Sequence, residues 1–328
     1  MTDARGPYFD ELEVGRVFAD APGITLTEGG AAVHRSIVGD RLRLALDHDL
    51  AERVTGRAGL AHPAYVWNTA IGQSTLATQH VRANLFYRGL AFHRAPYLGD
   101  TLTTTTEVVG LRENTRREGR PATGLVGLHM VTRDQHDERV LDFHRCAMLP
   151  LSDASVETGR ADDLDGLGAG TSDTGFADAW DLSAYVLRDP VPRLAPGDVI
   201  EVVGGDVVSS APELARLTGN LAQVHHDGRT AGGTRLVYGG HTIGIALGQV
   251  ARALPQLVTV LGWQGCDHVG PVHEGDTLRS SVAVLAVRPR GHGSVADLRV
   301  QVAADGEEQS QPVLDWRFTA LVTGSGGS

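Results

Sequence analysis

The sequence predicts an α+β protein made of two similar halves, each with one long helix and an antiparallel sheet. First, the tetrapeptide Gly-Asp-Thr-Leu stands at 99–102 and returns at 275–278, each time shortly after a proline. Second, Val-Leu-Asp followed by an aromatic residue stands at 140–143 and returns at 313–316. Third, the chain has 328 residues, 41% of them hydrophobic, which is enough for two globular cores. This ordered recurrence indicates a domain fused to its own duplicate.

The repeat is too long for a solenoid, whose units span about 20–50 residues. We therefore expect a first domain at 8–151 and a second domain at 180–323, each of ordinary domain size. Between them, residues 152–179 mix Ser, Asp, Gly, Ala and Thr with few large apolar side chains, which predicts a solvated linker. The two domains are expected to pack as a pseudo-dimer, in the manner of an isologous homodimer.

In the first half, an apolar stretch predicts a helix over 65–78. Three later segments alternate in polarity and are rich in β-branched residues, which predicts strands over 102–111, 123–133 and 140–149. The polar cluster at 134–137 separates the last two strands, so these should form a hairpin.

The second half repeats that order. A helix is predicted over 242–254, and strands are predicted over 278–287, 293–303 and 313–322. Gly244 and Gly248 lie within the helix, where a glycine costs about 1 kcal/mol relative to alanine. Such glycines predict the close approach of another backbone or a ligand, as for a helix wrapped inside a sheet. Joining the two sheets edge to edge would hide their exposed strand edges.

Composition excludes several classes of function. Acidic residues outnumber basic residues 40 to 29, and the net charge of −11 argues against nucleic acid or an anionic membrane surface as a partner. All the basic residues are arginine, so Schiff-base chemistry on lysine is excluded. Cys146 and Cys266 form no Cys-x-x-Cys motif, so neither a disulfide framework nor a cysteine-based zinc site is expected. No secretory signal and no apolar run of roughly 20 residues is present, so a cytoplasmic location is expected.

The proline-led Gly-Asp-Thr-Leu turns, the helix of small residues and an upstream Gly-Asn segment followed by histidine together resemble the MaoC-like hydratases. Members of that family have the hotdog fold, in which a sheet wraps one long helix, and duplicated members are double hotdogs. The pattern is similar to that of the mesaconyl-CoA hydratase (β-methylmalyl-CoA dehydratase) branch. The resemblance spans both halves and rests on the segments 83–87, 99–102, 108–114, 220–225, 235–241 and 268–278.

MaoC-type hydratases carry their catalytic pair in a Gly-Asp-x-Asn-Pro-x-His segment before the helix. The matching segment here starts at Gly219, and the resemblance implies that His225 is the general acid/base, since an imidazole titrates near neutrality. Asn220 replaces the aspartate and is expected to orient water or substrate, because an amide cannot act as a base. In the first half, Asp40 is present but Ala45 stands where the histidine is needed. One active site per chain is therefore expected, in the second half.

Each of these residues also has a structural interpretation. His225 lies in a His-His-Asp turn, where a buried histidine can serve only as a hydrogen-bonding group, and Asn220 is a common turn former. Asp40 is interpreted as an accessory residue or a relic of duplication. Asp227 and His226 form a polar neighbourhood that would either tune His225 or remain solvated.

Hydration of an enoyl thioester develops negative charge on the thioester oxygen, and backbone N–H groups at a helix N-terminus stabilise such charge. The resemblance places this donor at Gly240 or His241, where the second long helix begins, and leaves the two open. The alternative is a glycine turn that only enters the helix. Coenzyme A phosphates would need arginine in a chain without lysine, and the candidates are Arg229, Arg235 and Arg279. The sequence identifies no cation for a second carboxylate on the acyl group.

The preferred hypothesis is the reversible hydration of a 2-enoyl-CoA such as mesaconyl-CoA, without metal or cofactor, coenzyme A being part of the substrate. A second hypothesis is an enoyl-CoA or enoyl-ACP dehydratase of fatty-acid or secondary metabolism. A third is a hotdog thioesterase, which Asn220 disfavours because that reaction usually needs a carboxylate. A fourth is a non-catalytic subunit that binds acyl thioesters. The expected partners are the acyl-CoA and further copies of this chain, as a homodimer or a higher oligomer.

Overall fold

The computed structural model describes residues 6–170, 173–306 and 310–324. In the first half, the long strands are β3 (Ala83–Phe92), β4 (Thr101–Glu113), β5 (Thr123–Arg133) and β6 (Arg139–Pro150), with the short strands β1 (Val17–Phe18) and β2 (Ile24–Thr25). In the second half, they are β9 (Leu257–His268), β10 (Thr277–Arg290), β11 (Gly293–Asp305) and β12 (Ser310–Thr323), with β7 (Val199–Glu201) and β8 (Asp206–Val207). All six strands expected from the alternating pattern are present.

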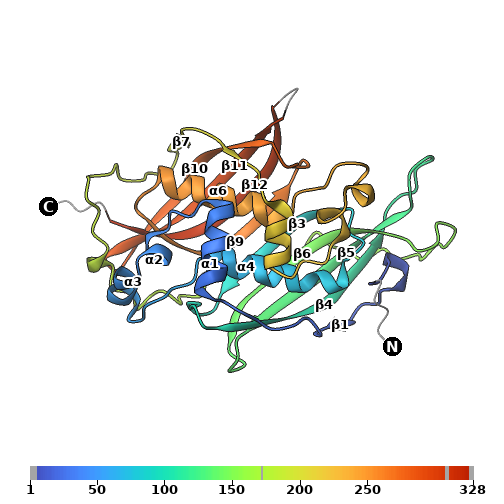
Figure 1. Cartoon of the computed structure of the whole chain (residues 1–328), viewed down its shortest axis with the longest axis horizontal. Helices are drawn as coiled ribbons and strands as arrows, with labels where there is room; N and C mark the ends of the chain where they lie inside the picture. The colour runs from blue at the N-terminus through green and yellow to red at the C-terminus, as the bar shows by residue number, and fades with distance from the viewer. Residues whose placement is uncertain (1–5, 171–172, 307–309, 325–328) are drawn as a thin grey trace.

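The sheets of the two halves form one continuous antiparallel sheet (Figure 1). Its strand order is β1-β4-β5-β6-β3-β9-β12-β11-β10-β7, with β2 beside β4 and β8 beside β10. The junction is the pair β3–β9, in which Tyr87 lies opposite Cys266 and Leu90 lies opposite Trp263. The expectation that the halves join edge to edge is therefore confirmed. Neither junction strand was among the predicted elements, because neither shows a regular alternation of buried and exposed residues.

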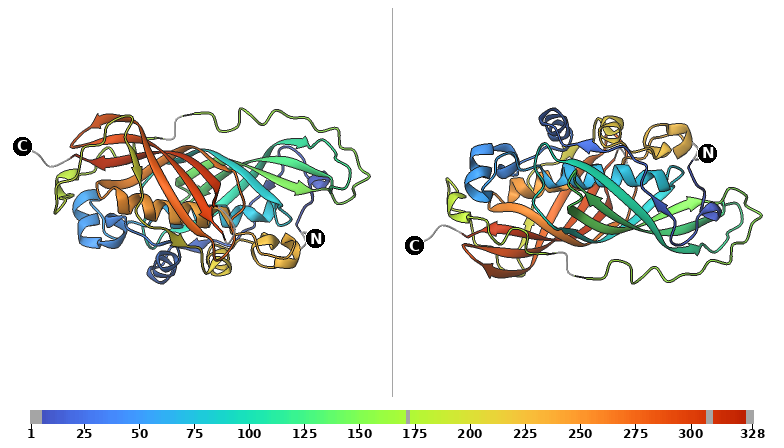
Figure 2. Two further views of the ribbon diagram at one scale, coloured as in Figure 1. Left: turned by 90° about the horizontal axis from the view of Figure 1, so that it is seen from above. Right: turned by 90° about the horizontal axis from the view of Figure 1, so that it is seen from below.

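The two expected long helices are present with shifted ends. The first is α4 (Pro63–Gln73), continued by the 3-10 turn η2 (Ser74–Ala77), and the second is α6 (Gly239–Ala253). Helix α4 begins two residues earlier than predicted because His62 caps it, its side chain accepting a hydrogen bond from the N–H of Ala64, and Pro63 opens the first turn. Both helices lie in the curve of the sheet (Figure 2).

The expectation of one long helix per half is wrong for the first half. There α1 (Glu28–Val38) is as long as α4, at 11 residues, and α3 (His48–Thr55) follows it. The shorter elements are α2 (Arg43–Leu46), α5 (Ala211–Leu217) and the 3-10 turns η1 (Phe9–Glu11), η3 (Leu182–Ala184), η4 (Gln223–His225) and η5 (Gly228–Ala231). The pair Gly29–Gly30 is typical of a turn, which conceals α1 in the sequence, whereas the Thr27 cap fixes its first turn.

The helices α1 and α5 lie outside the central pair, and each ends on the long helix of the other half (Figure 2). At the end of α1, Val38 and Gly39 contact α6 at Gly244 and Gly248. After α5, Thr218 contacts α4 at Gly72 in the same manner. The close backbone approach expected at the helix glycines is therefore confirmed, and the two halves interlock.

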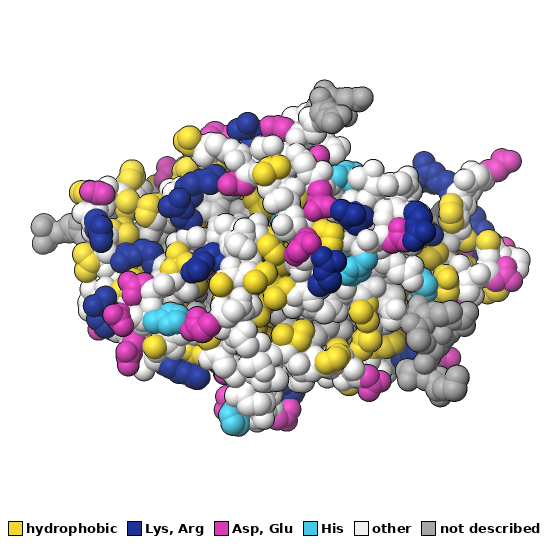
Figure 3. Space-filling view, in the orientation of Figure 1, with side chains coloured by type: hydrophobic (Ala, Val, Ile, Leu, Met, Phe, Trp, Pro, Cys, Tyr) yellow, Lys and Arg dark blue, Asp and Glu magenta, His cyan; other side chains and the backbone are white. Residues whose placement is uncertain are grey.

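The core draws on both halves. Trp67 of α4, Trp263 of β9 and Trp316 of β12 are fully buried and pack edge to face, with ring centroids 4.8–6.1 Å apart. The predicted linker runs along the outer face of the sheet (Figure 2), where Leu164 and Leu167 pack against Gly110 and Gly127. In the described part of the chain, no helix is long and apolar enough to span a membrane. On the face shown in Figure 3, basic and acidic side chains are interspersed rather than gathered by sign.

Candidate active site

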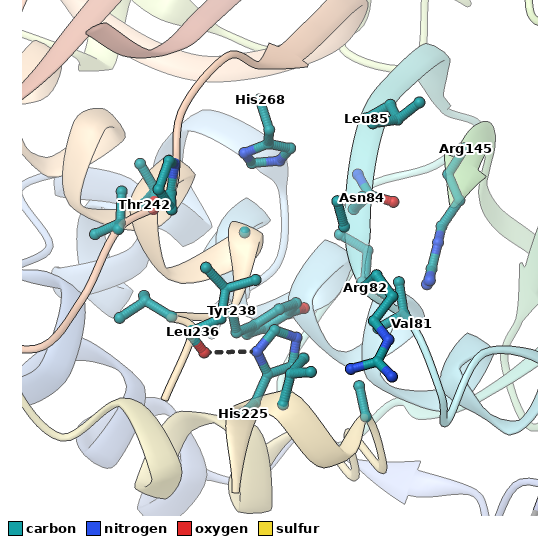
Figure 4. A pocket seen from close by; sticks show the side chains of 18 of the residues that line it. Val81, Arg82, Asn84, Leu85, Arg145, His225, Leu236, Tyr238, Thr242 and His268 are labelled. Carbon is teal, nitrogen blue, oxygen red and sulfur yellow. Dashed lines mark hydrogen bonds between the residues drawn. The ribbon is translucent and has the colours of Figure 1, made fainter. Parts of the chain in front are cut away.

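A pocket of about 300 Å³ lies where the two halves meet (Figure 4). The first half contributes α4, η2, the start of β3 and Arg145 of β6, and the second half contributes the segment 220–225, the start of α6 and the end of β9. Both predicted catalytic residues, Asn220 and His225, line it.

His225 is held as a neutral base. Its side chain is 9% exposed, and Nδ1 lies 2.8 Å from the backbone carbonyl oxygen of Leu236 (Figure 4). Because a carbonyl only accepts, Nδ1 carries the proton and donates it, which leaves the lone pair on Nε2. Burial lowers the pKa of His225 to about 4, although the hydrogen bond to Leu236 acts in the opposite direction, and the positive charge of Arg145 also lowers the pKa. The imidazole is therefore uncharged near pH 7.

Asn220 both forms a turn and lines the pocket, which are the two roles considered for it from the sequence. The residue is 3% exposed, and its Oδ1 accepts a hydrogen bond of 2.9 Å from the N–H of Ala222, which forms the turn. Because Oδ1 makes this bond, the Nδ2 group is the part of the amide that can donate a hydrogen bond to a ligand in the pocket. The backbone carbonyl of Asn220 accepts a hydrogen bond of 2.7 Å from Nε2 of His226, so His226 braces the turn rather than touching His225's free nitrogen.

The segment that carries these residues is tied to the first half. The N–H of Leu221 donates to Oγ1 of Thr75 at 2.8 Å, and the N–H of Gln223 donates to the carbonyl of Gln79 at 3.0 Å. The position of His225 therefore depends on contacts between the halves.

The start of α6 holds both oxyanion candidates, Gly240 and His241. The N–H of His241 donates to the carbonyl of Tyr238 at 2.9 Å, and its imidazole is fully buried away from the pocket. In the first turn of a helix, the N–H groups of Gly239 and Gly240 have no intrahelical acceptor. Gly239, which sequence reasoning did not single out, lines the pocket, and a Cβ there would lie 2.7 Å from the ring of His268. Gly239 and Gly240 therefore have the free backbone N–H groups at this helix start, and of the two Gly239 lines the pocket whereas Gly240 does not.

The accessory candidates lie elsewhere. Asp40 lies 2.9 Å from Nε2 of His62, in a separate polar pocket of about 270 Å³ in the first half. Asp227 pairs with Arg229, and Arg235 pairs with Glu274, all at the surface beside a shallow depression. None of these three candidates lines the pocket around His225.

Sequence reasoning gave no role to several polar residues of the pocket, among them Arg82, Asn84, Arg145 and His268. Burial lowers the pKa of His268 to about 4, and within the described residues its Nε2 has no hydrogen-bond partner. Asn84 belongs to a segment that the family resemblance includes, although no role was attached to it. Arg145 lies in a strand predicted from its alternation, and alternation carries no information about what a side chain meets across the molecule.

Comparison with known proteins connects this geometry to a family. No protein-family model matches the chain. The chain is 28% identical to the β-methylmalyl-CoA dehydratase of Chloroflexus aurantiacus, covering 97% of each chain, and 26% identical to the mesaconyl-CoA hydratase of Cereibacter sphaeroides, covering 98% of this chain and 99% of that one. Among solved structures, it is 54% identical to RV0216 of Mycobacterium tuberculosis, a conserved hypothetical protein with a double hotdog fold, over 96% and 98% of the two chains, with a TM-score of 0.91.

A MaoC-domain dehydratase structure from Chloroflexus aurantiacus aligns over 97% of both chains, with 26% identity and a TM-score of 0.85. The chain belongs to the MaoC-like double-hotdog family of hydratases and dehydratases. The α+β double-hotdog expectation is confirmed, including the continuous sheet that wraps two long helices. In this MaoC-like protein, as its sequence predicted, the segment before the second long helix lies at a pocket.

Proposed function

We propose that this MaoC-like protein catalyses the reversible hydration of a 2-enoyl-CoA, with mesaconyl-CoA and β-methylmalyl-CoA as the substrate pair, in the pocket around His225. The observation that carries the proposal is the neutral His225, fixed by Leu236, across a pocket bounded by the N-terminus of α6. The names of the two relatives, each matched along nearly its whole length, support the choice of substrate.

In the hydration direction, Nε2 of His225 removes a proton from a water molecule that the amide of Asn220 orients. The water oxygen bonds to the β-carbon, and the π electrons move to the α-carbon and the thioester oxygen. The N–H groups of Gly239 and Gly240, at the positive end of the α6 dipole, stabilise the charge on that oxygen. The imidazolium then returns its proton to the α-carbon. Water is thereby added across the double bond with no metal or cofactor, and the dehydration follows the same steps in reverse.

The coenzyme A moiety is assigned to the open side of the pocket. Arg82 is exposed, lines the pocket of His225 and also borders a neighbouring cavity of about 630 Å³. Its Nη1 donates to the carbonyl of Thr230, which leaves its other donors for a phosphate. By contrast, the arginines expected from sequence are paired with carboxylates: Arg229 with Asp227, Arg235 with Glu274 and Arg279 with Asp305.

Two alternatives remain within the same fold. A dehydratase acting on an enoyl-ACP would use the same His225 chemistry and differ only in the carrier. A non-catalytic acyl-thioester-binding subunit would bind the ligand without turnover. The neutral, pocket-lining imidazole favours catalysis, because a binding subunit has no need of a buried proton acceptor. Assembly into a homodimer or a higher oligomer stays a prediction.

The deciding experiment compares wild type with His225→Ala by following the loss of enoyl-thioester absorbance on mesaconyl-CoA and crotonyl-CoA. Removing a general acid/base should lower kcat by on the order of 10²–10⁴-fold. The matched control is His136→Ala, in the exposed β5–β6 turn, which should turn over like wild type. Equal rates for wild type and His225→Ala would refute the site. Binding without turnover by wild type would favour the non-catalytic subunit.

A further inference from the structure

The side chain of Arg145 is a buried cation without a counter-charge. It is 2% exposed, its Nη1 donates to Oγ of Ser74 and its Nη2 donates to Oγ1 of Thr78, both at 2.7 Å. Its Nε is buried and has no hydrogen-bond partner among the described residues. Within that part of the chain, no carboxylate lies within ion-pair distance of it, whereas the less buried Arg94 pairs with both Asp100 and Asp134.

This arrangement is costly for folding. Removing a guanidinium from water is unfavourable unless an opposite charge compensates it, and two neutral hydroxyls compensate only part of that cost. Burial accordingly lowers the pKa of Arg145, and only the phenols of Tyr87 and Tyr238 and the thiol of Cys146 oppose that shift. Among the residues that the structure describes, the charge has no partner that would explain its burial as a stabilising ion pair.

The pocket around Arg145 favours an anion. Its described lining includes Arg82, Arg145, His225 and His268 but no aspartate or glutamate, in a chain whose net charge is −11. Arg145, His225 and His268 line the same pocket, and the positive charge of Arg145 lowers the pKa of both imidazoles, after the larger effect of burial. An anionic group of a ligand would therefore find a complementary potential here.

A second group beside Arg145 also lacks a partner. The amide of Asn84, on β3, has its Nδ2 and Oδ1 atoms buried, and neither makes a hydrogen bond within the described structure. Figure 4 shows Asn84 and Arg145 on the same wall of the pocket, with Tyr238 and His225 across from them. A buried amide and a buried guanidinium left unsatisfied at one wall indicate a site completed by a ligand.

We propose that Arg145, with Asn84 beside it, binds a carboxylate on the acyl group of the substrate and makes the enzyme selective for thioesters of unsaturated dicarboxylic acids. A guanidinium presents its donors in a fork that matches the two oxygens of a carboxylate. The inference rests on the proposed function in placing the acyl group in this pocket. In this proposal the two halves have different roles: the first half binds the acyl carboxylate, and the second half supplies His225.

The position of the carboxylate suits the reaction. In a but-2-enedioyl thioester, the free carboxylate is bonded directly to the β-carbon that receives water. A residue that holds this carboxylate therefore also holds the β-carbon in place beside the base. The phosphates of coenzyme A are an unsuitable partner for Arg145, because they lie many bonds from the thioester and Arg145 is almost fully buried.

The first test measures kcat/KM on mesaconyl-CoA, which carries the carboxylate, and on crotonyl-CoA, which lacks it, for wild type, Arg145→Met and Arg82→Met. We expect Arg145→Met to lower kcat/KM on mesaconyl-CoA by on the order of 10²–10³-fold more than on crotonyl-CoA. Arg82→Met, at the rim, should lower both values by the same factor. A loss in Arg145→Met that is the same for both substrates would overturn the proposal.

A second test needs neither a variant nor turnover. Succinyl-CoA and butyryl-CoA are saturated, so they cannot be hydrated, and they differ in the terminal carboxylate. Calorimetric titration of the wild-type protein should show succinyl-CoA binding at least about tenfold more tightly, the equivalent of one good charged contact. Equal affinities would contradict the carboxylate site. Preference for succinyl-CoA without hydration of either enoyl thioester would instead retain the site and reject the proposed function.

Discussion

At the scale of single residues, burial sets the protonation of the candidate base. Burial lowers the pKa of His225 to about 4, and the hydrogen bond from Nδ1 to Leu236 fixes which nitrogen is free. A base of such low pKa removes a proton from water only when the product charge is stabilised at once. In the proposed reaction, the enolate that forms beside His225 would supply this negative charge, so that the imidazolium and the enolate stabilise each other.

The free-enzyme protonation of His225 should appear in the pH dependence of kcat/KM on crotonyl-CoA, whose acyl group does not titrate. Only the neutral imidazole accepts a proton, so kcat/KM should be level above about pH 5 and fall as the pH drops through about 4. Arg145→Met should move this midpoint upward, because it removes a positive charge that disfavours the imidazolium. Circular dichroism at each pH limits the range to folded protein. A midpoint near 6.5 would show an imidazole that behaves as if it were exposed.

At the scale of elements, a turn of each half packs against a glycine in the long helix of the other half. The turns after α1 and α5 end in the left-handed glycines Gly39 and Gly219, and the residues of these turns lie on α6 and α4. A Cβ at Gly248 would clash with the backbone carbonyl of Gly39, and a Cβ at Gly72 would clash with that of Thr218. Since Asn220 follows directly after this contact, the crossing at Gly72 also positions the candidate catalytic segment.

Replacing Gly72 or Gly248 with alanine should therefore lower the free energy of unfolding by about 1–3 kcal/mol, since a rigid backbone must move to admit the methyl group. Gly29→Ala, in α1, is the matched control, because nothing lies within 4 Å of the added Cβ. That change should be neutral or stabilising by up to about 1 kcal/mol through helix propensity. Urea denaturation measures all three. Equal stabilities for the Gly248 and Gly29 variants would disprove the close crossing.

At the scale of the whole molecule, the duplicated halves form one cooperative unit. The β3–β9 pair makes the sheet continuous, and the tryptophans of α4, β9 and β12 share one core. Unfolding one half would expose Trp67 or Trp263 and break the contacts of α1 or α5 on the other half. Neither half therefore has a complete core of its own.

We expect a single unfolding transition in urea, with the same midpoint by tryptophan fluorescence, which reports the shared core, and by far-UV circular dichroism, which reports the backbone. Independent domains would each unfold at their own stability. Two resolved transitions, or midpoints that differ between the probes, would show that the halves fold separately.

Features that repeat locally were accessible from the sequence. Alternating strands such as 123–133 and the small-residue helix at 242–254 are visible because one face of each meets the core at regular spacing. The paired motifs also located the segment of Asn220 and His225, which lies at the pocket as expected. The strands β3 and β9 were missed because neither shows a regular alternation of buried and exposed residues. Helices α1 and α3 were missed although local signals mark them, since Thr27 and Asp47 cap their first turns.

By itself, the sequence determined that this protein is a duplicated α+β chain of MaoC-like type. It also showed that the motif histidine is present in the second half, as His225, and is replaced by Ala45 in the first half. Only the tertiary structure decided what meets that histidine. It placed Asp40 in a different pocket and brought Arg145 and Asn84 from the first half into the site. It also showed that the free N–H groups at the start of α6 belong to Gly239 and Gly240. The physical reason is that burial, unpaired charge and unsatisfied donors arise from contacts between segments far apart in the chain, and no local pattern of residues encodes them.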